Sequence, residues 1–168
     1  DAMRNAAVRI IADVVKQTDV ELIAWTIMTN HLHLIIRQGV RPLSSFMQPI
    51  CRRLALQVHR HKNRKGHIFG KAYRETLIGD VFHLRNAIDY VHYNPVDVAH
   101  CTTSDAYVWS SSGIYTGAPR EHCAPNQPIV RQCLEVFATG PNRTIEQLQS
   151  DYREFAKWRA KCRSLPDD

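Results

Sequence analysis

VELIAWTIMTNHLHLIIR, residues 20–37, is the stretch of sequence that decides the fold. Its first half, residues 20–28, is rich in β-branched and aromatic residues that favour strands. Thr29 and Asn30 then supply turn chemistry, and residues 31–37 alternate again between polar and apolar side chains. Together these features predict an antiparallel β-hairpin.

Apolar periodicity predicts further elements on both sides of this hairpin, and the combination of helices with an antiparallel sheet indicates an α+β fold. The expected elements are a helix over residues 2–17, a helix from Pro42 to the 62–66 stretch, a strand over Tyr73–Ile78, and a third helix that Asp80 caps and Pro95 stops.

The last fifty residues differ in character from the rest of the chain. Prolines at 119, 125, 128 and 141 break this part into short pieces, which predicts a boundary near residue 118. The chain is therefore divided into a domain over residues 1–118 and an extension over 119–168. Thr144 and Gln147 have the spacing of a helix capping box, and the apolar residues that follow predict a terminal helix docked on the body.

Composition bounds the class of protein. The 168 residues contain no run of roughly 20 apolar residues, which a membrane-spanning helix needs. The five cysteines are odd in number and widely scattered, and no Cys-x-x-Cys pair suggests a zinc or redox site. We expect a soluble, cytoplasmic protein with reduced thiols.

Charge is unevenly distributed along the chain. No acidic residue lies between Glu21 and Glu75, whereas the same stretch carries ten cationic side chains. A segregated positive surface favours a polyanion such as nucleic acid, because phosphate neutralisation releases counterions; a solvated basic face is the alternative. The ten candidate DNA-binding residues are Arg37, Arg41, Arg52, Arg53, Arg60, Lys62, Arg64, Lys65, Lys71 and Arg74.

His31 and His33 are two residues apart in the second predicted strand, so both imidazoles face the same side of the sheet. Two adjacent nitrogen donors form half of a metal site; a pair of surface histidines is the alternative. A hard cation such as Mg or Mn also requires oxygen ligands. Asn94 on the third helix can supply an amide oxygen.

Tyr90 lies four residues before Asn94, on the same face of that helix. One helix can therefore deliver both a third metal ligand and a nucleophile, although a tyrosine packed at a helix edge has the same pattern. A phenol with a pKa near ~10 needs a cation or a base to stabilise its phenolate. Attack on a phosphodiester would give a 5′-phosphotyrosine and a 3′-hydroxyl without a nucleotide cofactor. Tyr93 competes for this role but has no amide four residues on.

Two segments resemble the signatures of a known family. They are residues 28–35, MTNHLHLI, and residues 90–96, YVHYNPV. Both are similar to signatures of the REP-associated tyrosine transposases of the HUH superfamily, in which U is a bulky apolar residue. Between and after them, residues 66–69 with Tyr73-Arg74, and then Trp109-Ser110-Ser111, look like further family elements in the same order.

The resemblance implies a ferredoxin-like antiparallel sheet with helices packed on one face, followed by a C-terminal helical extension. It implies His31, His33 and Asn94 as ligands of a divalent metal, Mg or Mn, and Tyr90 as the nucleophile of a transposase. The implied substrate is single-stranded DNA with imperfect palindromes that fold as hairpins. The implied location is the prokaryotic cytoplasm or nucleoid, and related proteins are monomers or homodimers.

The sequence departs from the family pattern at three points. The family's first strand is not found before the first helix, Asp97 stands where Arg is common, and Thr29 stands where Pro is frequent. The first two motivate an alternative, a hairpin-DNA-binding module of the same fold without catalysis. An RNA-binding ferredoxin-like domain is a further alternative, which would need exposed stacking aromatics on its strands, and residues 20–28 offer only Trp25.

Overall fold

A two-stranded antiparallel sheet lies at the centre of the structure, a computed structural model that describes residues 2–62, 66–70, 73–118 and 127–163. Its strands are β1 (Glu21–Ile27) and β2 (Leu32–Arg37). In their register Trp25 lies opposite Leu34 and Thr26 opposite His33. The predicted hairpin and the α+β class are confirmed.

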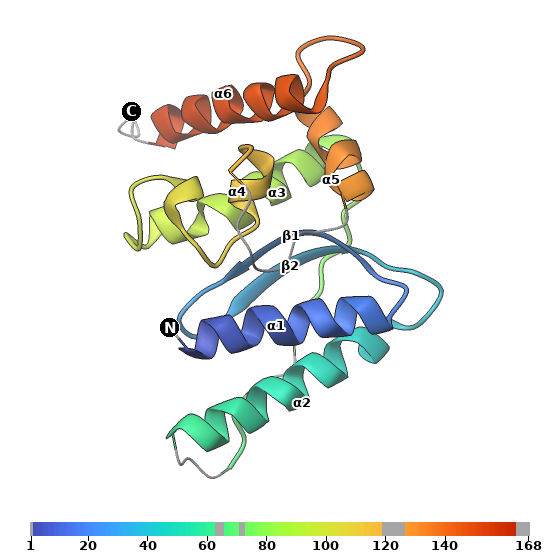
Figure 1. Ribbon diagram of the computed structural model, residues 1–168, viewed down its shortest axis with the longest axis vertical. Coiled ribbons are helices and arrows are strands. Elements are labelled where there is room, and N and C mark those ends of the chain that lie inside the picture. Colours follow the sequence, from blue (N-terminus) through green and yellow to red (C-terminus); the bar gives the residue numbers. More distant parts are fainter. Residues whose placement is uncertain (1, 63–65, 71–72, 119–126, 164–168) are drawn as a thin grey trace.

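Helices cover both faces of this sheet (Figure 1). On one side lie α1 (Ala2–Gln17) and α2 (Leu43–Lys62). On the other lie α3 (Val81–Asp97), α5 (Gln127–Leu134) and α6 (Ile145–Arg163). The predicted arrangement, with helices on one face only, differs from this structure in that respect.

The reason is that both faces of the hairpin are apolar. Trp25 and Leu34 point toward α1 and α2, where they share a core with Phe46. Ile23 and Ile35 point the opposite way into a second core with α3 and the C-terminal helices. Each face therefore needs its own helical cover to be removed from water.

Short elements complete the chain: η1 (Ser104–Ala106), α4 (Ser112–Tyr115) and η2 (Glu135–Phe137). The terminal helix α6 begins with the predicted capping box. The backbone N–H of Gln147 donates to Thr144 Oγ1 at 3.3 Å, and the backbone N–H of Thr144 donates to Gln147 Oε1 at 2.8 Å. The predicted boundary near residue 118 adjoins residues 119–126, which lie outside the described part of the chain. The division into two domains stays a prediction.

The strand expected over residues 73–78 is wrong. This stretch forms no strand in the structure, and the described sheet contains β1 and β2 alone. A strand needs a neighbouring backbone to pair with its N–H and C=O groups, and none lies alongside within the described residues. Instead a groove of about 1060 Å³ is lined by this stretch together with β2, α1 and α2. Leu77 in this stretch is 89% exposed.

The expectation that Pro95 stops the third helix is also wrong, because α3 continues through Pro95 to Asp97. Proline lacks the N–H that would bond to the Val91 carbonyl four residues earlier. In this structure the buried Thr26 hydroxyl of β1 donates to that carbonyl at 2.7 Å. The substitute donor satisfies the Val91 carbonyl, so the helix can continue past Pro95 to Asp97.

Candidate functional site

The imidazoles of His31 and His33 lie together on the face of the hairpin that is turned toward α3. Their Nε2 atoms are 3.1 Å apart, and the rings meet edge to face. Two ligands at roughly 2.1 Å from one metal ion and at right angles to each other would be about 3.0 Å apart. The spacing therefore fits two adjacent ligands of one cation.

Asn30 in the hairpin turn fixes the orientation of His31. Its side-chain oxygen lies 2.7 Å from His31 Nδ1. An amide oxygen can only accept, so Nδ1 carries the proton and Nε2 presents its lone pair toward His33. From the sequence Asn30 is expected only as a turn residue, and its position next to His31 is the signal that could have identified this second role.

His33 is held in the neutral form that a metal requires. Burial, and next the nearby charge of His31, lower its pKa from the ordinary value. A neutral imidazole keeps the lone pair that binds a cation, whereas a protonated one repels it. His33 is therefore prepared as a nitrogen donor near neutral pH.

Tyr90 of α3 lies against His33. The two rings have centroids 5.3 Å apart and planes at 80° to each other, and Tyr90 is 50% exposed. The structure thus brings the three residues His31, His33 and Tyr90 together from the hairpin and a distant helix. Tyr93, the competing tyrosine, lies under the guanidinium of Arg163 at 4.0 Å from its ring centroid.

Thr26 explains why α3 lies beside the histidines. It is the register partner of His33, and its hydroxyl bonds to the carbonyl of Val91, the residue after Tyr90. Its Oγ1 also lies 3.0 Å from Ser110 Oγ, which joins the neighbouring Trp-Ser-Ser segment to the same place. The Thr26 side chain therefore links the strand position opposite His33 to the helix turn that carries Tyr90.

Asn94 is the candidate for a third ligand. It is buried, and its Oδ1 has no hydrogen-bond partner among the described residues. A buried acceptor without a partner calls for a donor or a cation to satisfy it. The described ranges contain no group of three or more His, Cys, Asp and Glu that could hold a metal. Within them, the candidate donors for a divalent cation are the two imidazoles and this amide oxygen, and the amide oxygen is the donor of the kind that Mg and Mn prefer.

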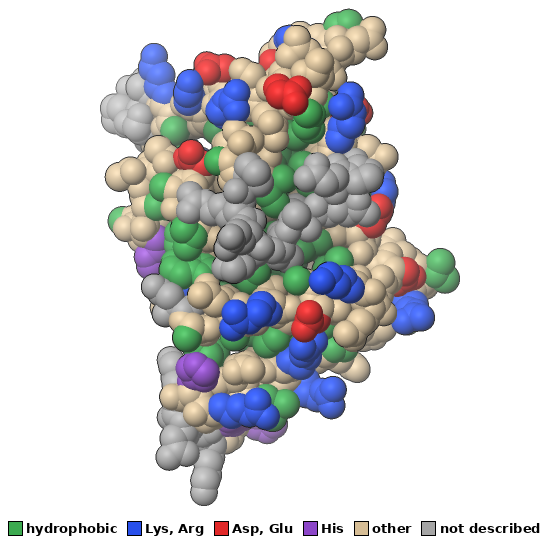
Figure 2. Space-filling view, viewed as in Figure 1, with side chains coloured by type: hydrophobic (Ala, Val, Ile, Leu, Met, Phe, Trp, Pro, Cys, Tyr) green, Lys and Arg blue, Asp and Glu red, His purple; other side chains and the backbone are tan. Residues whose placement is uncertain are grey.

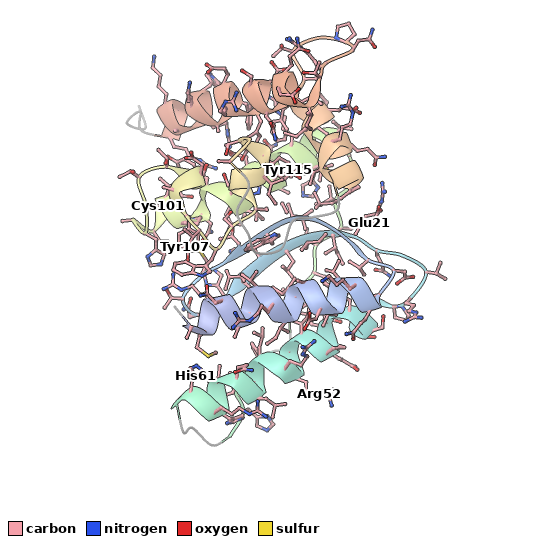
Figure 3. All side chains as sticks on the ribbon, in the orientation of Figure 1. Glu21, Arg52, His61, Cys101, Tyr107 and Tyr115 are labelled. Atoms are coloured by element: carbon pink, nitrogen blue, oxygen red, sulfur yellow. The ribbon has the colours of Figure 1, made fainter. Side chains whose placement is uncertain are left out.

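The predicted DNA-binding residues separate into two groups. Arg37 pairs with Glu21 across the hairpin, and Arg53 pairs with Asp13 of α1 at 2.8 Å, so acids partly neutralise both. Figure 2 shows Lys and Arg side chains over the α1 and α2 side of the molecule, and Figure 3 shows Arg52 projecting from α2. The exposed members of the set are Arg37, Arg41, Arg52, Arg60 and Arg74. Lys62 is the last residue of α2, and only its backbone is described. The described residues do not include Arg64, Lys65 and Lys71.

The groove beside β2 connects His31 to basic side chains. His31 and Asn30 line it together with Arg74 and with Arg4 of α1. Arg4 was not among the predicted DNA-binding residues, because it belongs to a helix whose net charge is unremarkable. A strand of nucleic acid that reaches His31 through this groove would pass both cations.

Comparison with known proteins agrees with the geometry. Residues 1–94 match the family described as "Transposase IS200 like". The match covers more than half of the chain and includes both histidines, Tyr90 and Asn94, so the protein belongs to the IS200-like transposases. The resemblance predicted from the two signatures is confirmed, and DNA is the partner that this family implies.

Neither the curated proteins nor the solved structures gave a match. None of the helices in the described ranges combines the length and the apolar character needed to cross a membrane.

Proposed function

We propose that this transposase is a metal-dependent single-stranded DNA endonuclease and strand transferase that acts at hairpin-forming palindromic repeats, with Tyr90 as its nucleophile. One observation carries the proposal: the Tyr90 ring contacts the ring of His33, whose Nε2 is 3.1 Å from that of His31. A phenol that is half exposed beside two imidazoles is accessible to a phosphodiester and lies next to the proposed cation site.

The reaction follows from the chemistry of a phenol and a phosphodiester. The Tyr90 oxygen attacks the phosphorus, an oxygen–phosphorus bond forms, and the bond from phosphorus to the 3′ oxygen breaks. The phenol loses its proton to solvent, and the departing 3′ oxygen takes one up. The products are a 5′-phosphotyrosine and a 3′-hydroxyl. Since one phosphodiester replaces another, a 3′-hydroxyl can attack the phosphotyrosine and rejoin DNA without a nucleotide cofactor.

His31, His33 and Asn94 would hold a divalent cation, Mg or Mn. Such a cation, when bound, draws charge from the phosphoryl oxygens and favours the phenolate over the phenol. The chain's own contribution is to keep His33 neutral through burial and to aim His31 Nε2 through Asn30. Arg74, on the wall of the groove with His31, would contact backbone phosphates and not bases, so it orients the strand without reading its sequence.

The test is covalent trapping. The protein is incubated with Mn and 5′- or 3′-labelled single strands that fold as hairpins, and denaturing gels are searched for a protein–DNA adduct. We expect an adduct that retains the DNA on the 3′ side of the cut, disappears in Tyr90→Phe and persists in Tyr93→Phe. An adduct that survives in Tyr90→Phe would assign the nucleophile to another residue.

The same gels address the alternative of a binding module without catalysis. The exposed Asp97, at a position where the family commonly has Arg, motivates it. This alternative predicts salt-dependent affinity for hairpins and no adduct with any metal. The RNA-binding alternative loses its main support in the structure, because Trp25 is 2% exposed and packs in the core beneath α1 and α2.

A further inference from the structure

Helix α6 lies on the side of α3 that faces away from the sheet, and side chains of the two helices are in contact (Figure 1). The contacts begin near the N-terminal end of α3, where the Arg85 guanidinium lies 4.2 Å from the ring centroid of Phe155. They continue toward the C-terminal end, where His92 Nδ1 lies 2.7 Å from the Tyr152 hydroxyl. The two helices are therefore joined over about two turns of α3.

A buried ion pair lies at the middle of this contact. Asp89 of α3 is 3% exposed, and its Oδ2 accepts hydrogen bonds from Arg159 Nε at 3.0 Å and from Arg163 Nη2 at 2.9 Å. The Arg163 guanidinium also covers the Tyr93 ring. A carboxylate this buried is strongly disfavoured without its partners, so the pair allows one arrangement of the two helices and resists others.

The angular positions of these residues around α3 connect the pair to the site. At 3.6 residues per turn, Asp89 points roughly 100° away from Tyr90, and His92 roughly 160° away. A roll of α3 about its axis that carried Tyr90 off His33 would also pull Asp89 off the two arginines. The ion pair thus opposes the motion that would separate the phenol from the imidazole.

We propose that α6 is a positioning element for the transposase reaction, in which Arg159 and Arg163 act through Asp89 to hold α3 at the rotation that sets Tyr90 against His33. The inference rests on the proposed function. It assigns a role to a helix that lies beyond the family match, which ends at residue 94.

The first test separates positioning from binding. Arg159→Gln and Arg163→Gln are compared with Lys157→Gln, which removes the same charge from α6 at an exposed residue paired with Glu154 of its own helix. Adduct formation is timed with hairpin DNA at saturating concentration, and DNA affinity is measured separately. Since misplacement by about 1 Å can cost about 100-fold, we expect the rate to fall by about 10- to 100-fold in the first two variants with DNA affinity unchanged. Lys157→Gln should match the wild type.

A second readout reports the Tyr90 position without any chemistry. In ¹H–¹³C spectra the His33 ring signal carries the shift caused by the Tyr90 ring, and Tyr90→Leu identifies its value when that ring is absent. We expect Arg159→Gln and Arg163→Gln to move the His33 signal toward that value while Lys157→Gln leaves it in place. The readout remains valid if the wild type forms no adduct, which would refute the proposed function and not this inference.

Two outcomes would overturn the role of α6. One is a wild-type adduct rate with an unmoved His33 signal in variants that thermal melting shows to be folded. The other is a loss of DNA affinity in proportion to the loss of rate, which would make α6 a support for DNA binding or for folding in general. Arg163→Lys provides a graded check, because it keeps the charge but loses the planar group that covers Tyr93, and it should lie between Arg163→Gln and the wild type.

Discussion

Tyr90 and His92 are two residues apart on α3, yet they belong to two histidine–tyrosine clusters with opposite properties. In the exposed cluster, Tyr90 meets His33 at the surface, beside His31. In the buried cluster, His92 meets Tyr152 in the core, where each is 1% exposed. The same residue types therefore occur in both, and their surroundings decide what each cluster can do.

The buried cluster has no capacity left for a ligand. His92 bonds through Nδ1 to Tyr152 and through Nε2 to Ser111 Oγ, both at 2.7 Å. Burial lowers the pKa of His92 to about 3 and raises that of the Tyr152 phenol, so neither group ionises near neutral pH. In the exposed cluster, two Nε2 atoms face each other and the Tyr90 phenol reaches solvent. Open lone pairs, more than residue type, distinguish the exposed cluster from the buried one.

The largest effect is expected from breaking the exposed cluster. His33→Ala removes a proposed metal ligand and the ring against which Tyr90 lies. A bound metal contributes several kcal/mol to such a reaction, so we expect adduct formation to fall by about 100-fold or more. The free energy of unfolding should change by less than about 1 kcal/mol, because the site is partly exposed. Gel assays and urea unfolding measure the two quantities. Full activity in His33→Ala would show that the exposed cluster takes no part in the reaction.

The next effect is expected in the buried cluster and concerns stability. His92→Ala leaves the Tyr152 and Ser111 hydroxyls without their partner and opens a cavity in the core. Unsatisfied buried groups cost about 1–3 kcal/mol each, so we expect the free energy of unfolding to drop by about 3 kcal/mol in urea titrations. A loss below about 1 kcal/mol would show that water or neighbouring groups replace the imidazole.

A smaller effect on the exposed cluster is expected from Asn30→Ala. The variant keeps both imidazoles but no longer holds His31 with Nε2 toward His33. Second-layer partners of metal-binding histidines are worth about 10- to 100-fold in metal affinity, and we expect a loss of that size in Mn titrations. Asn30→Asp is the matched control, because its carboxylate still accepts from Nδ1 and should preserve binding. Equal Mn affinities in the wild type, Asn30→Ala and Asn30→Asp would show that Asn30 does not contribute to metal binding.

The sequence predicts those parts of the exposed cluster that local periodicity sets. The two-residue repeat of a strand puts His31 and His33 on one face, and the helical repeat puts Tyr90 and Asn94 on another. The hairpin, α1, α2 and α6 follow from the same kind of pattern. Only the resemblance to a family indicated that the strand face with the histidines meets the helix face with Tyr90. No local pattern encodes the contact between two elements about 60 residues apart in the sequence.

The unpredicted features all depend on such long-range contacts. Asp89 and Arg159 are 70 residues apart, and nothing in their local sequence links them. Helix α3 continues past Pro95 because Thr26, 65 residues away from Val91, supplies the missing donor. Residues 73–78 have the composition of a strand, but strand formation depends on a neighbour that composition does not reveal. The secondary-structure preference of the residues predicted the elements that form from local sequence alone. It failed for the elements whose structure depends on a distant part of the chain.

The effect that contrasts the two clusters most directly is the dependence of stability on pH. The ordinary pKa of histidine is near 6.5, and that of His92 in the folded protein is about 3. Between these values the unfolded chain binds a proton at His92 that the folded protein cannot bind. The stability contributed by the neutral buried ring is therefore complete above pH 6.5 and decreases as the pH falls toward about 3, by up to about 1.4 kcal/mol per pH unit.

Urea unfolding of the wild type and of His92→Gln at pH 7.5, 6.5, 5.5 and 4.5 tests this dependence. The variant should be less stable at pH 7.5, but the free energy of unfolding should decrease less steeply below pH 6.5, because the titrating group is gone. Carboxylates contribute equally to both slopes and cancel in the difference. His33→Ala should reduce the slope much less, since its ring is only partly buried and its pKa is lowered less far. If His33→Ala and His92→Gln flattened the slope alike, burial would not be what distinguishes the two clusters.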